Sequence, residues 1–171
     1  AAGRLDISVN VIGVGDVQRP LMDLSVSDFM QPIDIATRTQ FVTTKAAARH
    51  MIAQRGGVVL AFGGGGTQTI AGLGGFKVAL DAVESLRRQW SVELGAYGIR
   101  VVTVKTGGIP ETLPAGMAGR DEIIDSIEQA TLLGRAATLA DVGNVAAFVA
   151  SDAARTMTAT DINISCGSLM D

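Results

Sequence analysis

The stretch that decides the fold is Gly56–Val101, GGVVLAFGGGGTQTIAGLGGFKVALDAVESLRRQWSVELGAYGIRV. It begins with a branched apolar run, Val58–Phe62, and passes through a glycine-rich segment, Gly63–Gly66. A long helical pattern follows over Phe76–Leu94, and a second branched run, Arg100–Lys105, closes the unit. A strand, a crossover helix and a second strand in this order predict a right-handed βαβ unit with parallel strands.

The same alternation of short branched runs and longer helical patterns continues on both sides of this unit. Two further strands are expected at Leu5–Asn10 and Asp161–Ile164. Three further helices are expected at Ser27–Arg55, Asp121–Leu133 and Ala140–Ala150. Thr138, followed three residues later by Asp141, predicts a capping box at the start of the last helix. The chain, residues 1–171, is therefore expected to be a single α/β domain with a parallel sheet.

Composition narrows the class of protein. Hydrophobic residues make up 47% of the 171 residues and aromatic residues only 4%, so the core must consist of Ala, Val, Ile and Leu. The net charge of −3, with no block of like charge, argues against nucleic acid as a partner. The single cysteine, Cys166, excludes an internal disulfide and favours a reducing, cytoplasmic compartment. No apolar run approaches the roughly 18 residues of a membrane span.

The helical pattern over Phe76–Leu94 has three faces at 100° per residue. The apolar stripe consists of Phe76, Ala79, Leu80, Val83, Leu86, Trp90 and Leu94. A charged face carries Lys77, Asp81, Glu84 and Arg88, and the spacing predicts a Glu84–Arg88 pair. The third strip consists of Val78, Ala82, Ser85, Gln89 and Val92. Two interpretations stay open: the helix covers a sheet and also packs on a second helix, or it is a partly buried surface helix.

Nearly the whole chain resembles the short-chain dehydrogenase/reductase family. GRLDISVNVIG, residues 3–13, is similar to the family's strand-four signature, which usually ends N-N-A-G; Asn10 and Gly13 match it. ELGAYGIRVVTVKTGGI, residues 93–109, is similar to the strand-six region, whose Pro-Gly pair is here Thr106–Gly107. LLGRAATLADVGNVAAFVASDAARTMTATDINISCGS, residues 132–168, follows the family's C-terminal helix, loop and strand.

This resemblance implies a Rossmann-type, doubly wound parallel sheet and NAD or NADP as cofactor. The cofactor-binding positions that it implies are Asn10, Gly13, Gly107 and Ile109. The family's Thr that reaches the nicotinamide carboxamide falls at Glu111. The first residues correspond to strand four of the family. Two alternatives stay open for the half with strands one to three and its T-G-x-x-x-G-I-G turn: the biological chain is longer and includes it, or the domain is incomplete.

The family's catalytic tetrad is replaced at all four positions. In the family a Ser ends the strand, a Tyr lies thirteen residues later, a Lys follows one turn on, and an Asn lies on the preceding helix. Those places hold Gly63, Phe76, Leu80 and Ala36. The resemblance therefore implies loss of the proton donor, of the cation that lowers its pKa, of the carbonyl-holding hydroxyl and of the relay amide.

Few residues are candidates to replace these groups. Lys105 ends the strand-six region, is expected to point near the nicotinamide region, and is the best candidate for a relocated functional group. Lys77 is expected to be a solvated partner on the charged helix face. Cys166 is expected to be an inert, buried thiol. The Gly63–Gly66 run lacks the pattern of a phosphate-binding loop and is expected to be a flexible active-site loop, with hydrogen-bonding groups at Thr67–Thr69.

These observations lead to one expectation with two alternatives. We expect a catalytically degenerate family member that acts as a binding or structural partner, with weak or lost cofactor binding. The first alternative is an active NAD(P)-dependent carbonyl or alcohol oxidoreductase that uses relocated groups, Lys105 or water. The second is a small-molecule sensor. We expect no metal site, and a homodimer or homotetramer whose interface forms from the helices after strands four and five.

Residues 1–171 expressed alone should aggregate or form a molten state. In the family, strand four lies in mid-sheet beside strand one. In residues 1–171 alone, Leu5–Asn10 would lack that neighbour and would form an exposed apolar edge. Thermal unfolding of this polypeptide, followed by near-UV circular dichroism, measures the outcome. A sharp, cooperative transition of a monomer would contradict the expectation.

Overall fold

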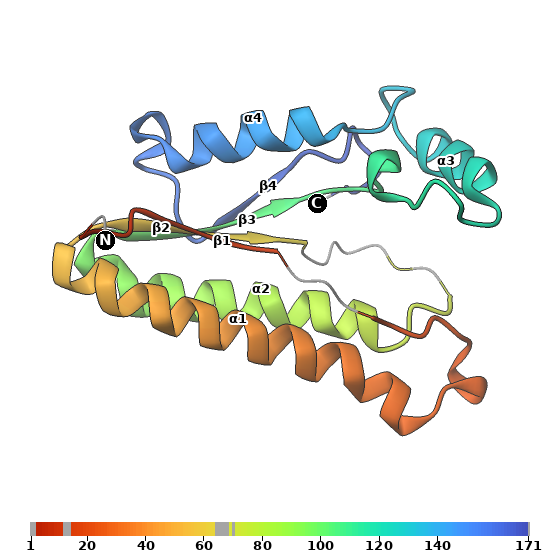
Figure 1. Cartoon of the computed structure of the whole chain (residues 1–171), viewed down its shortest axis with the longest axis horizontal. Helices are drawn as coiled ribbons and strands as arrows, with labels where there is room; N and C mark the ends of the chain where they lie inside the picture. The colour runs from red at the N-terminus through yellow and green to blue at the C-terminus, as the bar shows by residue number, and fades with distance from the viewer. Residues whose placement is uncertain (1–2, 12–14, 64–68, 70, 171) are drawn as a thin grey trace.

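Four parallel strands form one sheet in the order β1-β2-β3-β4 (Figure 1). The computed structural model describes residues 3–11, 15–63, 69 and 71–170. The strands are β1 (Ile7–Asn10), β2 (Gly57–Phe62), β3 (Ile99–Lys105) and β4 (Thr160–Asn163). Each expected strand is confirmed to within two residues at either end. The sheet confirms the predicted α/β fold.

Helices cover both faces of the sheet. They are α1 (Val26–Gln54), α2 (Gly75–Leu94), α3 (Arg120–Gln129) and α4 (Leu139–Ala150). Short 3-10 turns lie at Leu21–Asp23, Gly95–Tyr97, Pro110–Thr112 and Asp152–Ala154. Helices α1 and α2 lie on one face and α4 lies on the other, so the sheet is doubly wound (Figure 1). Among the described residues, no helix is long and apolar enough to span a membrane.

Local hydrogen bonds set the ends of the helices. The Thr138–Asp141 capping box at the start of α4 is confirmed, and the hydrogen bond from the Thr138 amide is the main reason that the pKa of the Asp141 carboxyl lies below its usual range. The third helix was expected to reach Leu133, but α3 ends at Gln129. The N–H groups of Leu132 and Leu133 donate instead to the carbonyl of Cys166, at 3.0 and 3.2 Å, so this segment leaves the helix.

The core has the composition that the sequence predicted. The buried apolar side chains are Ala, Val, Leu and Ile, together with Met51. Between α1, α2 and the sheet they form two clusters, one around Met51 and Val101 and one around Ala36 and Ala79. The opposite face packs Val102 of β3 on Val149 of α4. Small branched side chains on both faces are what a parallel sheet between helix layers requires.

Helix α2 differs from the predicted pattern at its charged face. Glu84 does not pair with Arg88 in solvent; it is 4% exposed and accepts from Arg87 Nη2 at 2.7 Å. The i,i+3 step places Arg87 beneath the helix, facing the sheet, where its guanidinium reaches the carboxylate. Helix α2 packs along α1 as well as on the sheet. This confirms the interpretation of a helix that covers a sheet and also packs on a second helix. Its third strip stays exposed, with Val92 82% exposed.

Strand β1 lies at the edge of the described sheet. Its side chains Ile7 and Val9 are 43% and 55% exposed. This is the exposed apolar edge expected from the sequence, because β1 pairs only with β2 among the described strands. Whether these residues fold alone stays a prediction.

Gly75→Ala should destabilise the full-length protein by about 1–3 kcal/mol. A Cβ at Gly75 would overlap the carbonyl of Phe29 on α1, so the two helices would have to separate. Gly95→Ala is the matched control, because no atom lies within 4 Å of its Cβ position and its φ of −58° suits any residue. Urea unfolding measures both variants. Equal stability of the two would contradict the proposed close approach.

Candidate functional site

The four tetrad-equivalent positions meet in one cavity at the carboxyl ends of the strands. The cavity has a volume of about 540 Å³, and its lining includes Ala36, Gly63, Phe76 and Leu80. Ligand sites of open parallel sheets lie at this edge. The four residues line the same cavity although they come from α1, the end of β2 and the first two turns of α2.

Gly63 and Leu80 lie side by side in this cavity. A Cβ built on Gly63 would lie 3.1 Å from Leu80 Cδ2. Gly63 follows β2 directly, and its N–H donates to the carbonyl of Val104 on β3 at 3.2 Å. Its φ of 103° lies in the region that side-chain-bearing residues rarely adopt. At this position the chain differs from a strand-ending Ser in its backbone as well as in its side chain.

The lining of the cavity is apolar. Further apolar lining residues are Val9, Val11, Phe62, Ala79, Val83, Ile109, Leu139 and Val142. Among the described lining residues only Thr106 and Thr112 carry a polar side chain. Thr112 Oγ1 donates to the carbonyl of Ile109 at 2.8 Å, within its own turn. The described lining offers no carboxylate, amine or imidazole for general acid–base chemistry.

The implied cofactor positions lie in different surroundings. Ile109 lines the cavity. Asn10 is buried, and its Nδ2 donates to Thr44 Oγ1 at 3.1 Å. A Cβ at Gly107 would overlap the Ser168 side chain, so Gly107 packs on the C-terminal segment. Gly13 lies outside the described residues. None of the described positions among them carries a cationic side chain. They therefore do not provide the contact that the family's Lys makes with the ribose.

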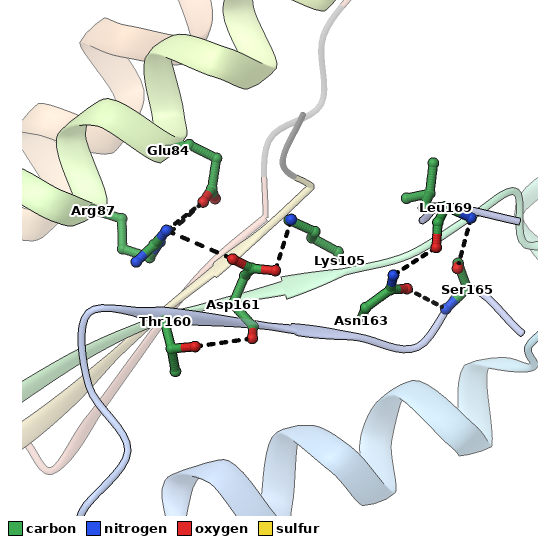
Figure 2. Close-up of polar contacts among 8 residues, drawn as sticks. All are labelled: Glu84, Arg87, Lys105, Thr160, Asp161, Asn163, Ser165 and Leu169. Carbon is green, nitrogen blue, oxygen red and sulfur yellow. Dashed lines mark hydrogen bonds and ion pairs between the residues drawn. The ribbon is translucent and has the colours of Figure 1, made fainter. Parts of the chain in front are cut away.

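Lys105, the candidate for a relocated functional group, does not line this cavity. Its side chain is buried, and Nζ lies 2.7 Å from Asp161 Oδ2 on β4 (Figure 2). Arg87 Nη2 lies 3.7 Å from Asp161 Oδ1 and 2.7 Å from Glu84 Oε2. Two cations and two carboxylates thus share one buried network between α2 and the sheet. Charge pairing with Asp161 on the neighbouring strand sets the direction of the Lys105 side chain.

Sequence reasoning missed this network and one further contact. Asp161 and Lys105 lie on adjacent parallel strands. The signal in the sequence was a charged residue in each of the two branched runs that form these strands. Glu111, at the family's Thr position, accepts a hydrogen bond from the N–H of Leu139. It therefore satisfies an open donor at the start of α4 and ties the Pro110–Thr112 turn to that helix.

The remaining candidates have structural surroundings. Lys77 Nζ pairs with Asp81 at 2.6 Å, as expected for the charged face of α2. Cys166 is half-buried rather than fully buried, because it lines a second cavity of about 500 Å³ together with Arg135. Gly64–Gly66 and two of the expected hydrogen-bonding residues, Thr67 and Gln68, lie outside the described residues. Over the ranges described, no group of three His, Cys, Asp or Glu residues is placed to hold a metal.

Comparison with known proteins agrees with the resemblance. The family model described as enoyl-(acyl carrier protein) reductase matches residues 1–168. Secoisolariciresinol dehydrogenase of Forsythia intermedia is 31% identical, over 96% of this chain and 62% of its own length. The NADH-dependent enoyl-[acyl-carrier-protein] reductase FabI of Nostoc sp. is 29% identical, over 96% of this chain and 65% of its own length. The chain thus spans less than two thirds of these two relatives.

Solved structures give the same result. A short chain dehydrogenase/reductase family protein superposes with a TM-score of 0.80 at 26% identity, covering 97% of this chain and 68% of its own. A 7α-hydroxysteroid dehydrogenase in complex with NADH has a TM-score of 0.82 at 23% identity, over 99% and 66% of the two chains, which shows the common fold. With the family model matching almost the whole length, the chain belongs to the short-chain dehydrogenase/reductase family.

Proposed function

We propose that this oxidoreductase-family protein has lost the Asn-Ser-Tyr-Lys tetrad and acts by binding rather than by turnover. One observation carries the proposal. Ala36, Gly63, Phe76 and Leu80 come together in a single cavity, and none of them has a side chain that can donate a proton or hold an oxyanion. A family fold supplies the frame for an activity, whereas the activity itself depends on the site.

The chemistry of carbonyl reduction makes the loss severe. A carbonyl that accepts hydride also needs a proton, and Phe76 fills the proton donor's position without having one. Loss of a positioned general acid lowers the rate by about 10²–10⁴. Loss of an oxyanion donor, here the hydroxyl absent at Gly63, lowers it by a further ~10²–10³, although the two factors need not multiply.

An active oxidoreductase with relocated groups is the second candidate. It is favoured by the relatives, which carry the names of dehydrogenases and reductases. The relocated group would have to be Lys105 or water. The pairing of Lys105 with Asp161 at 2.7 Å speaks against the lysine, because a cation held by a carboxylate is a poor proton donor.

Binding remains available to the protein without catalysis. A cavity of about 540 Å³ has room for a small molecule, and its lining favours an apolar one. NAD or NADP, where bound, would be held weakly, because Leu80 replaces the Lys that contacts the ribose in the family. A sensor of a small apolar compound is one form of this function. We place it in the cytoplasm, since its one cysteine is a free thiol.

The exposed strip of α2 supports an assembly of like chains. It consists of Val78, Ala82, Ser85, Gln89 and Val92, and Val78 and Val92 are 42% and 82% exposed. Phe41 and Val42 on the neighbouring α1 are 50% and 58% exposed. The Ala46–Ala48 run of α1, the other part of the expected interface, is exposed only at Ala46, because Ala47 and Ala48 are buried in the core. A partly apolar strip along α2, next to exposed apolar side chains on α1, suits packing about a two-fold axis. The proposed assembly is a homodimer or homotetramer.

The full-length protein should oxidise NAD(P)H in the presence of ketones and quinones at well below 1 s⁻¹, the lower end of typical enzymes. The reason is the missing proton donor in the cavity. Long-incubation and stopped-flow absorbance at 340 nm measure the rate. Turnover above about 1 s⁻¹ would refute the degenerate interpretation. Loss of that turnover on Lys105→Ala, with retention on Lys77→Ala, would establish the relocated-group candidate.

Ala82→Arg should convert the assembly into monomers. The substitution places a long cation in the middle of the α2 strip, where it must be desolvated on association. Light scattering at micromolar concentration measures the mass. Arg88→Ala is the control, because Arg88 is exposed on the same helix but lies outside the strip. An unchanged assembly after Ala82→Arg, or a strictly monomeric native protein, would rule out this interface.

Gly63→Ser should destabilise the protein by about 1–3 kcal/mol and should not restore activity. The φ of 103° strains any side-chain-bearing residue, and the new Cβ would press on Leu80 Cδ2 at 3.1 Å. Gly143→Ala, exposed within α4 with open space at its Cβ position, should instead be neutral or stabilising. Chemical unfolding compares the two. A Gly63→Ser protein of native stability would show that the backbone there readily accepts a serine.

A further inference from the structure

The buried charge network beneath α2 has no part in the cavity's chemistry. It comprises Glu84, Arg87, Lys105 and Asp161, which carry two positive and two negative charges (Figure 2). The side chains of Glu84, Arg87 and Lys105 are between 4% and 8% exposed, and that of Asp161 is 22% exposed. The two shortest contacts, Arg87–Glu84 and Lys105–Asp161, both measure 2.7 Å.

Stability alone is a poor explanation for such a network. Desolvation of buried ions offsets their attraction, and well-packed apolar replacements are often as stable or more so. The network is also incompletely satisfied. Glu84 Oε1 and Arg87 Nη1 are buried with no hydrogen-bond partner in the described part of the chain. The ions can instead contribute a defined geometry. A pair of charged side chains fixes the relative position of the two elements that carry them, whereas apolar contacts allow the elements to slide.

The geometry that the Lys105–Asp161 pair defines is the attachment of β4. This strand has four residues, none fully buried, and pairs only with β3 in the described sheet. The pair joins the two strands through side chains. Next to it, the N–H of Ile164 donates to the carbonyl of Lys105 at 2.9 Å. The end of β4 is thus held to the end of β3 by one ion pair and the backbone ladder.

A polar turn follows directly on this attachment (Figure 2). Asn163 Nδ2 donates to the carbonyl of Leu169 at 2.8 Å, and its Oδ1 accepts from the N–H of Ser165 at 3.1 Å. Ser165 Oγ accepts from the N–H of Leu169 at 3.0 Å. The turn is closed by its own side chains and follows β4 directly, and the Cys166 carbonyl within it also accepts from the N–H groups of Leu132 and Leu133.

The turn lies against the wall of the cavity. A Cβ on Gly107 would overlap the Ser168 hydroxyl and lie 3.4 Å from Ser165 Cβ, so the turn and Gly107 are in contact. Thr106, which precedes Gly107, and Ile109 line the cavity. Lys105 is the last residue of β3 before this segment. Lys105 therefore directly precedes the wall residue Thr106. Its partner Asp161 lies shortly before the turn that contacts Gly107.

We propose that Lys105 and Asp161 are positioning residues that fix β4 and its polar turn against Thr106–Gly107, and through them the wall of the cavity. Neither residue touches the contents of the cavity. The pair acts by fixing the position of the polar turn, which in turn supports the cavity wall. This role is independent of whether the protein turns over a substrate.

The test replaces both ions together in the full-length protein, as Lys105→Met with Asp161→Leu, so that neither ion of the pair is left without the other and Arg87 keeps its shorter contact with Glu84. Residue-resolved hydrogen exchange reports the amides of Ile164 and Leu169, and the methyl resonances of Ile109 report the cavity wall. We expect exchange at Ile164 and Leu169 to rise at least tenfold and the Ile109 resonances to shift. The amide of Val58, which donates to the carbonyl of Asp6 at 2.8 Å, should exchange as in the native protein.

The single variant Asp161→Asn and a matched control complete the test. Asp161→Asn keeps the shape and removes the charge, so it should give the same local change at Ile164 and Leu169. Asp81→Asn breaks the Lys77–Asp81 pair, which has a similar length of 2.6 Å but lies within α2 and has an exposed carboxylate, with Lys77 and Asp81 21% and 53% exposed, and should change neither readout. Native exchange at Ile164 and Leu169 in the double variant would overturn the proposal. So would an equal rise at all amides, which would show that the pair contributes only general stability.

Discussion

The parallel pairing of β2 with β3, with α2 crossing between them, is the constraint on which the site depends. This pairing aligns Phe62 with Val104, so that the two chain segments leave the sheet at the same edge. Gly63, directly after β2, then lines the same cavity as Phe76 and Leu80, which lie in the first two turns of α2. The crossover therefore brings the cavity together whichever side chains the positions carry.

The crossover keeps the frame while the chemistry of the four positions is free to change. The cavity has a volume of about 540 Å³ with carbon side chains at three of these positions and none at the fourth. Apolar replacements at such positions carry no cost of burying an unpaired polar group, so they are compatible with a stable fold. Charge is absent from the described lining but concentrated nearby, in the network of Glu84, Arg87, Lys105 and Asp161, where each cation has a carboxylate.

Much of the fold could be predicted from periodicity, because each strand is a branched run and α2 carries an apolar stripe. The capping box at Thr138 and the relative positions of Gly63, Phe76 and Leu80 also followed from the sequence. What failed was the direction of individual charged side chains. Glu84 was assigned to a charged outer face, and the pairing of Lys105 with Asp161 was not foreseen, because helical and strand periods cannot reveal a partner on another element. Asp161 supplies that partner, and its distance along the chain hides it.

The central claim is that the cavity has lost the cation that anchors a nicotinamide cofactor. The most direct measurement is a calorimetric titration of the full-length protein with NADH, before and after Leu80→Lys. The account predicts a dissociation constant weaker than micromolar for the native protein, and a gain of about one to two decades on Leu80→Lys, corresponding to roughly 1.5–3 kcal/mol. Val78→Lys, on the exposed strip of α2, should bring no gain. Submicromolar affinity of the native protein would contradict the account, because another group would then have to replace the lysine.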